Sequence, residues 1–166
     1  KKKFEINFIS RSLEGNLISN IQQKGFTVFR FYSNSKKINI KNDAQKTIAI
    51  IRKYGNPKNM LIVDNYELSK KWETYMKPYV YKLIVIDDLP HRSHNCELLI
   101  DQNLHSKVNG LYEGLIPPKC IKLIGPKFSM IRNEFRMIRK SAKPRTFPIK
   151  KLLVSFGGTD IEKQTI

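Results

Sequence analysis

Short apolar runs alternate along the chain with longer amphipathic segments in which apolar residues recur every three or four positions. A short apolar run bounded by turn residues predicts a buried β-strand, and the longer period predicts a helix with one face toward the core. Strand and helix follow each other in turn, which predicts an α/β fold with a Rossmann-like parallel sheet. The predicted strands are Phe4–Ser10, Thr27–Phe31, Met60–Val63, Tyr81–Ile86, Glu97–Ile100, Ile121–Ile124 and Lys151–Phe156.

The helices are predicted from capping residues, helix-stopping residues and apolar faces. Ser12 is the expected cap of the first helix and Asp43 that of the second, which Gly55 ends. A third helix is expected near Leu68–Met76 and a fourth, basic one over Ser129–Lys140. The apolar residues expected to face the interior in the region of the fourth helix are Phe128, Ile131, Phe135 and Ile138.

Polar residues follow three successive apolar strands at the point where each ends. Asp64–Tyr66 follows one strand, Asp87 and Asp88 follow the next, and Asp101–Asn103 closes the third. Polar groups at the carboxyl edge of an open α/β sheet surround a ligand, so we predict a site there. Adjacent side chains of an extended segment point in opposite directions, so one acid is expected to cap a turn while the other faces the cleft. For Asp64 the alternative is an Asx-turn that caps the next helix.

Glycine-containing segments follow two later strands. In Phe156–Asp160, the glycines allow the backbone to approach a phosphate, and a helix start beyond them favours negative charge; a plain strand-to-helix turn is the alternative. Gly125–Phe128 fits the lining of a nucleotide pocket or a helix-initiating turn. Arg132 and the basic residues after it fit a solvated helix face.

The net charge of the chain is high for its size, at +17 over 166 residues. Such a charge fits a nucleic acid, an anionic membrane surface or a phosphate-bearing substrate, and it also fits a general lysine bias. The chain carries no RNA-recognition motif, which makes a nucleic-acid-binding module the weaker alternative. Its apolar runs are shorter than the roughly 20 residues of a membrane helix, so a cytoplasmic protein is expected.

A zinc site is suggested by His91, His94 and Cys96, which lie close together in the sequence. Their spacing fits none of the usual closed zinc sites, and a second pair of ligands is missing. We therefore expect no metal ion. Cys96 and Cys120 are too few for a disulfide framework.

The two ends of the chain predict a fragment of a longer protein, truncated on both sides. Lys1 directly precedes a strand, and the capping box Thr159–Glu162 opens a helix shortly before the last residue, Ile166. Pro144 and Pro148 predict a linker. The expected organisation is an amino-terminal Rossmann-like domain over 1–140, a linker over 141–149 and the start of a nucleotide-binding domain over 150–166.

With these motifs in order, the chain resembles the UDP-2,4-diacetamido-2,4,6-trideoxy-β-L-altropyranose hydrolases of pseudaminic acid synthesis and the related spore-coat polysaccharide biosynthesis proteins. The matching segments are Phe8–Ile21, Leu61–Tyr66, Ile86–Asn103, Tyr112–Pro117, Gly125–Phe135 and Val154–Asp160. They follow the family's order over nearly the whole chain. The resemblance implies the amino-terminal domain of a two-domain architecture like that of B-type glycosyltransferases.

The same resemblance implies a hydrolase that adds water to the anomeric carbon of a UDP-sugar and releases UDP, without a cofactor or metal. It carries over a catalytic role for Tyr66. The substrate-binding residues that it implies are Asp64, Asn65, Asp87, Asp88, Gly125, Phe128, Arg132, Gly157, Gly158 and Thr159. A nucleotide-sugar glycosyltransferase of the same architecture is the alternative among enzymes.

The family pattern opens with a strand and a Gly-x-Gly-His-x-x-Arg loop that this sequence lacks. None of His91, His94 and His105 takes the place of the loop histidine, so the resemblance implies that the chain by itself is inactive. The first strand of a doubly wound sheet is central. We therefore expect that Leu152–Phe156 or the N-terminal strand fills its place, or that a central slot stays open.

Overall fold

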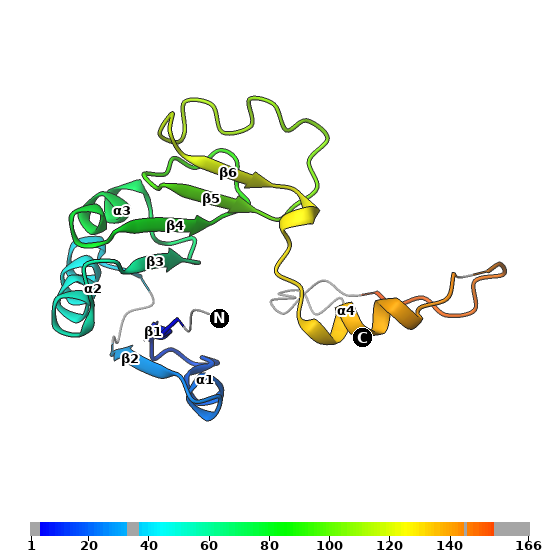
Figure 1. Ribbon diagram of the computed structural model, residues 1–166, viewed down its shortest axis with the longest axis horizontal. Helices are drawn as coiled ribbons and strands as arrows, with labels where there is room; N and C mark the ends of the chain where they lie inside the picture. The colour runs from blue at the N-terminus through cyan, green and yellow to red at the C-terminus, as the bar shows by residue number, and fades with distance from the viewer. Residues whose placement is uncertain (1–3, 33–36, 145, 155–166) are drawn as a thin grey trace. The chain divides into compact units, whose positions relative to one another are not determined.

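The computed structural model describes residues 4–32, 37–144 and 146–154, and it confirms an α/β fold with a parallel sheet (Figure 1). The chain divides after Ser129 into two compact units. The elements in chain order are β1 (Asn7–Arg11), α1 (Ile18–Gln23), β2 (Thr27–Phe31), α2 (Ile40–Tyr54), β3 (Met60–Val63), α3 (Lys70–Met76), the 3-10 helix η1 (Lys77–Tyr79), β4 (Lys82–Ile86), β5 (Leu98–Asp101), β6 (Ile121–Ile124), the 3-10 helix η2 (Pro126–Phe128) and α4 (Asn133–Ser141).

The strands β3, β4, β5 and β6 form a four-stranded sheet in that order, and every pairing is parallel. Ile84 of β4 lies opposite Ile62 of β3 and Leu98 of β5. Such apolar, largely β-branched residues pack well on a pleated surface, which explains why these short segments form strands. Because all four strands run the same way, the segments that follow β3, β4 and β5 emerge at the same edge.

One hydrophobic core joins this sheet to α2 and α3, which lie side by side next to β3 and β4 in Figure 1. The free thiols of Cys96 and Cys120 lie in it with their sulfur atoms 3.6 Å apart. The alternate residues of the outer strands, Met60, Ile62 and Ile121, point to the other face and are half or more exposed. The buried core residues are Ala44, Val63, Trp72, Met76, Leu83, Val85, Cys96, Leu99, Tyr112 and Cys120.

The strands β1 and β2 form a separate two-stranded parallel sheet. In the described part of the chain, the second edge of β1 and the outer edge of β3 have no strand paired to them. Among the described residues, neither of the two expected replacement segments pairs with these edges. β1 stays beside β2, and the described part of the predicted last strand, Lys151–Val154, is not a strand.

Two predicted helix starts are wrong. The first helix, α1, begins only at Ile18, where Asn16 Oδ1 accepts a hydrogen bond from the Ile18 N–H at 3.1 Å, and Ser12 lies well before it. The second, α2, begins three residues before Asp43 because Asn39 is its N-cap and accepts from the Asn42 N–H at 3.0 Å. Asn and Asp are nearly equal as caps, so sequence preference did not separate them.

The second compact unit contains α4, which begins later than the predicted Ser129. The expectation that its apolar side chains face inward is wrong for the structure described: Ile131, Phe135 and Ile138 are all exposed. Phe128 belongs to η2, in the first unit, and is half-buried there. The amphipathic pattern was real, but it does not specify which surface covers the apolar face.

Candidate active site

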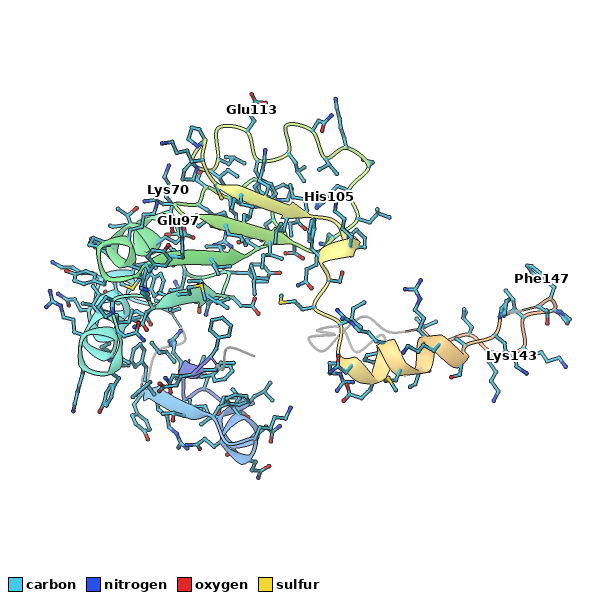
Figure 2. The ribbon with its side chains drawn as sticks, in the orientation of Figure 1. Lys70, Glu97, His105, Glu113, Lys143 and Phe147 are labelled. Atoms are coloured by element: carbon cyan, nitrogen blue, oxygen red, sulfur yellow. The ribbon has the colours of Figure 1, made fainter. Side chains whose placement is uncertain are left out.

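The segments after β3, β4 and β5 place Tyr66, Asp88 and Asn103 in direct contact at the carboxyl edge of the sheet. The Tyr66 hydroxyl donates to Asp88 Oδ1 at 2.6 Å, and Asn103 Nδ2 donates to Asp88 Oδ2 at 2.9 Å. These three residues are called the Tyr66–Asp88 site below. Figure 2 shows the side chains at this edge, with His105 labelled near the ends of β5 and β6. The predicted convergence of strand-end residues is confirmed for Tyr66 and Asp88.

The turn that presents Tyr66 is held by its neighbours. Asn65 Oδ1 accepts a hydrogen bond from the Glu67 N–H at 2.8 Å, so the predicted Asx-turn is real but belongs to Asn65 rather than Asp64. Arg92 Nη2 donates to the carbonyl oxygens of Tyr66 at 2.6 Å and Leu68 at 2.9 Å. The Asp64 side chain stays exposed beside this turn.

The two adjacent acids after β4 have different roles, as the alternation of an extended segment predicts. Asp87 is buried, its Oδ1 accepts from the Leu89 N–H at 2.8 Å, and its Oδ2 forms an ion pair with Arg92. Asp88 is only partly buried and turns toward Tyr66. Asp87 therefore anchors the loop that carries Arg92, and Asp88 is the more exposed of the two acids.

A buried histidine–glutamate pair connects α3 to the loop that carries Arg92. His94 Nδ1 lies 2.7 Å from Glu73 Oε1 of α3, and the other Glu73 oxygen accepts from the Asn95 N–H. His94 Nε2 lies 3.4 Å from Asp87 Oδ2. Both His94 and Glu73 are fully buried, which makes this a structural pair that ties α3 to the site loop.

At the end of β5, Asp101 is a third buried acid, after Asp87 and Glu73. Its Oδ2 lies 2.6 Å from His105 Nε2 and accepts from the Tyr112 hydroxyl at 2.9 Å, while Oδ1 accepts from the Asn103 N–H at 3.0 Å. Burial, together with the hydrogen bond to Asp101, raises the pKa of Tyr112 well above its usual range. Asp101 thus fixes the backbone of Asn103, which in turn holds Asp88.

The pKa of Tyr66 is raised to about 12, mainly by its hydrogen bond to Asp88 and further by desolvation and by the charges of the nearby acids. A phenol with this pKa is neutral at physiological pH and acts as a hydrogen-bond donor rather than as a base. A phenol donor beside a carboxyl acceptor suits the hydroxyl and amide groups of a carbohydrate.

The remaining predicted residues are spread over other parts of the chain. Gly125 follows β6 with φ 105°, a conformation that favours glycine, and its N–H donates to the Asp101 carbonyl at 2.8 Å. Phe128 and Lys127 line a separate cavity of about 360 Å³ with Lys122. Arg132 lies in the second unit, with its guanidinium 5.1 Å from the centre of the Phe135 ring. Gly157, Gly158 and Thr159 lie outside the described residues.

Sequence reasoning missed the roles of Arg92, Glu73 and His94, which hold the site in place through partners distant in sequence that no local pattern reveals. Asp101 and Asn103 were expected at the site because they end an apolar strand, but their hydrogen bonds were not predicted. Within the described ranges, the structure shows no group of three or more His, Cys, Asp or Glu residues placed to hold a metal ion.

Comparison with curated proteins confirms the resemblance drawn from the motifs. The chain is 29% identical over 168 residues to the UDP-2,4-diacetamido-2,4,6-trideoxy-β-L-altropyranose hydrolase of Campylobacter jejuni, a match that covers 100% of this chain and 54% of that protein. It is 25% identical over 166 residues to an uncharacterised protein of Methanocaldococcus jannaschii, covering 96% of this chain and 31% of that protein. The chain therefore spans about half the length of the first relative and less of the second.

No protein-family model matches the chain. Over the described parts of the structure, none of the helices is both long enough and apolar enough to cross a membrane.

Proposed function

We propose that the protein is a nucleotide-sugar hydrolase that releases UDP from a UDP-diacetamido-trideoxyhexose, and that this chain supplies the sugar-facing domain of a two-domain enzyme. The observation that carries the proposal is the contact of Tyr66 and Asp88 at the carboxyl edge of the sheet, where α/β enzymes bind ligands. Its support from outside the chain is the similarity of this chain, over its whole length, to about half of the Campylobacter hydrolase.

In the proposed reaction, a water oxygen forms a bond to the anomeric carbon as the bond from that carbon to the UDP oxygen breaks. UDP leaves with the bonding electron pair, and the proton lost by the water passes to the departing phosphate oxygen or to solvent. UDP is a stable leaving group, so the main task of the protein is to position the sugar against the water. Tyr66 donates a hydrogen bond to the sugar or the departing oxygen, and Asp88 accepts one from a sugar hydroxyl or amide group.

The direct test is an assay of UDP release by the full-length protein with UDP-diacetamido-trideoxyhexose as substrate. Tyr66→Phe removes one donor and keeps the ring, so we expect kcat to fall by about a hundredfold. Tyr75→Phe, a matched change at a partly exposed tyrosine of α3, should keep the full rate. An unchanged rate in Tyr66→Phe would exclude a catalytic role for this residue.

A glycosyltransferase of the same architecture predicts a different outcome. If an added sugar acceptor receives the sugar faster than water does, the enzyme is a transferase and the hydrolase proposal is wrong. If UDP release is the same with and without acceptors, hydrolysis is the reaction.

A further inference from the structure

We propose that a cavity at the carboxyl ends of β1 and β2 is a binding site for a small phosphate-bearing ligand, separate from the Tyr66–Asp88 site. The cavity has a volume of about 270 Å³, is open to solvent, and is lined by residues at the ends of the two strands and the beginning of α2. It is called the β1–β2 cavity below. This inference goes beyond the proposed hydrolase activity, which does not require a second site.

Positive charge dominates the lining of the β1–β2 cavity. Arg11 comes from the end of β1, Lys37 from the segment before α2, and Lys46 from α2 itself. The one carboxylate in the lining, Asp43, is partly buried and its Oδ1 accepts a hydrogen bond from Trp72 Nε1 at 2.8 Å. Three cationic side chains line the cavity, while two acids lie at it: Asp43, which is bound to the core, and Glu67, which pairs with Arg11. The remaining excess of positive charge favours an anionic ligand.

The polar groups in the lining suit phosphate oxygens. Arg11 presents a guanidinium, which binds phosphate through two parallel hydrogen bonds, and Lys46 presents a point charge. Asn42 lies one turn before Lys46 on α2, so its amide reaches the same cavity. Arg11 also pairs with Glu67 at 3.3 Å, and this pair holds the guanidinium at the cavity wall.

Aromatic residues in the lining indicate a ligand that carries an organic group in addition to the phosphate. The buried ring of Phe31 lies beneath Lys46, whose Nζ is 5.7 Å from the ring centre, and Tyr32 is 74% exposed beside it. Sugar rings pack against exposed aromatic rings such as that of Tyr32. The volume lies just below the roughly 300 Å³ at which pockets for larger ligands begin. The lining therefore fits a phosphorylated monosaccharide better than an entire nucleotide sugar.

The cavity and the Tyr66–Asp88 site have different side chains but are linked through one contact. Glu67, the partner of Arg11, directly follows Tyr66. The chemistry that the cavity recognises is a phosphate group, which two sources supply: a free sugar phosphate, and the diphosphate of a nucleotide sugar bound across both places. The two sources are distinguished by the size of the ligand that binds.

The test is nuclear magnetic resonance titration of the isotope-labelled full-length protein with glucose 1-phosphate, inorganic phosphate, UDP and unphosphorylated glucose. We expect glucose 1-phosphate and phosphate to shift the amide signals of Asn39 and Asn42, and glucose to leave them unchanged. Stronger binding by UDP at the same signals would assign the cavity to the nucleotide diphosphate. Shifts confined to Tyr66, Asp88 and their neighbours would overturn the separate site.

Lys46→Gln removes one cavity charge and should weaken glucose 1-phosphate binding about tenfold, the loss of one charge-assisted hydrogen bond. Lys53→Gln is the matched control, since Lys53 lies on the same helix and its Nζ is over the Tyr54 ring rather than in the cavity. Equal weakening by both changes would mean non-specific attraction and would overturn the proposal. Circular dichroism of both variants shows whether α2 is still folded. Asn42→Ala is a second variant, which removes an uncharged side chain of the cavity, and it should also weaken the binding of glucose 1-phosphate.

Discussion

Asp88 has hydrogen bonds on both carboxylate oxygens, one from the Tyr66 hydroxyl and one from the Asn103 amide. The arrangement fixes the acid in place while leaving lone pairs for a ligand, since each carboxylate oxygen accepts two hydrogen bonds. It also keeps Tyr66 protonated, with a pKa of about 12. At the scale of single residues, the site is therefore a fixed donor–acceptor pair.

Asp88→Asn is expected to lower the pKa of Tyr66 from about 12 toward its ordinary value of 10. The change removes the carboxylate that accepts from the phenol, which is the largest cause of the upward shift. Resonances of labelled tyrosine rings, followed against pH, measure the pKa of each tyrosine separately. Asp64→Asn removes a more weakly interacting acid and should shift it less; equal effects of the two changes would contradict this assignment.

The buried pair of Glu73 and His94 gives a prediction on stability. Glu73→Ala leaves both His94 Nδ1 and the Asn95 N–H without their acceptor inside the protein. We expect the free energy of unfolding to fall by about 3 kcal/mol, because an uncompensated buried polar partner is strongly destabilising. Urea denaturation measures it, with Glu14→Ala at an exposed position as the control. A loss no larger than that of the control would show that the pair contributes nothing.

At the scale of elements, α2 connects the two sheets of the first unit. Its Ala44 and Thr47 are buried, Asp43 accepts a hydrogen bond from Trp72 of α3, and Tyr54 packs against Phe29 of β2 with ring centres 4.7 Å apart. Burial raises the pKa of Asp43 despite that hydrogen bond. The stability of α2 therefore depends on contacts along its whole length and on the cap at its N-terminus.

Removing the cap of α2 by Asn39→Ala is expected to lower the free energy of unfolding by about 1 kcal/mol, because the Asn42 N–H loses its acceptor. Ser12→Ala should cost less, since α1 begins at Ile18 rather than after Ser12. Thermal denaturation of the two variants side by side provides the measurement. A larger loss of unfolding free energy in Ser12→Ala than in Asn39→Ala would support Ser12 as the cap of the first helix, as predicted from the sequence.

At the scale of the whole molecule, charge is the most distinctive property. The net charge of +17 attracts any polyanion, and it does so without sequence or shape selectivity. The three cations at the β1–β2 cavity account for a small part of it. Most of the charge is therefore a property of the surface in general, and it needs a test separate from the proposed activity.

Binding of single-stranded RNA to the protein is expected to fall by at least a hundredfold between about 50 and 200 mM salt, because phosphate contacts release counterions. UDP should not compete with it. Fluorescence anisotropy of a labelled RNA, measured at both salt concentrations with and without UDP, gives the result. Tight RNA binding that survives the higher salt would favour a nucleic-acid-binding protein over a nucleotide-sugar enzyme.

The sequence by itself determined where β1 to β6 lie and where polar groups gather, although the described part of the predicted strand Lys151–Phe156 is not a strand. Thr27–Phe31, Met60–Val63 and Ile121–Ile124 are strands at the predicted bounds, because short apolar runs are a local property of the chain. The contact of Tyr66 with Asp88 followed from the rule that parallel strands end at one edge. Such inferences need only the period of side chains and the direction of strands.

Only the tertiary structure decided which groups hold the site and which surfaces stay exposed. Arg92 reaches the carbonyl oxygens of Tyr66 and Leu68, and Glu73 reaches His94, across long stretches of sequence. Such pairs form because packing brings distant segments together and a buried polar group must find whichever partner is near. The exposed apolar face of α4 has the same origin, since a periodic pattern specifies a face but not the surface that covers it.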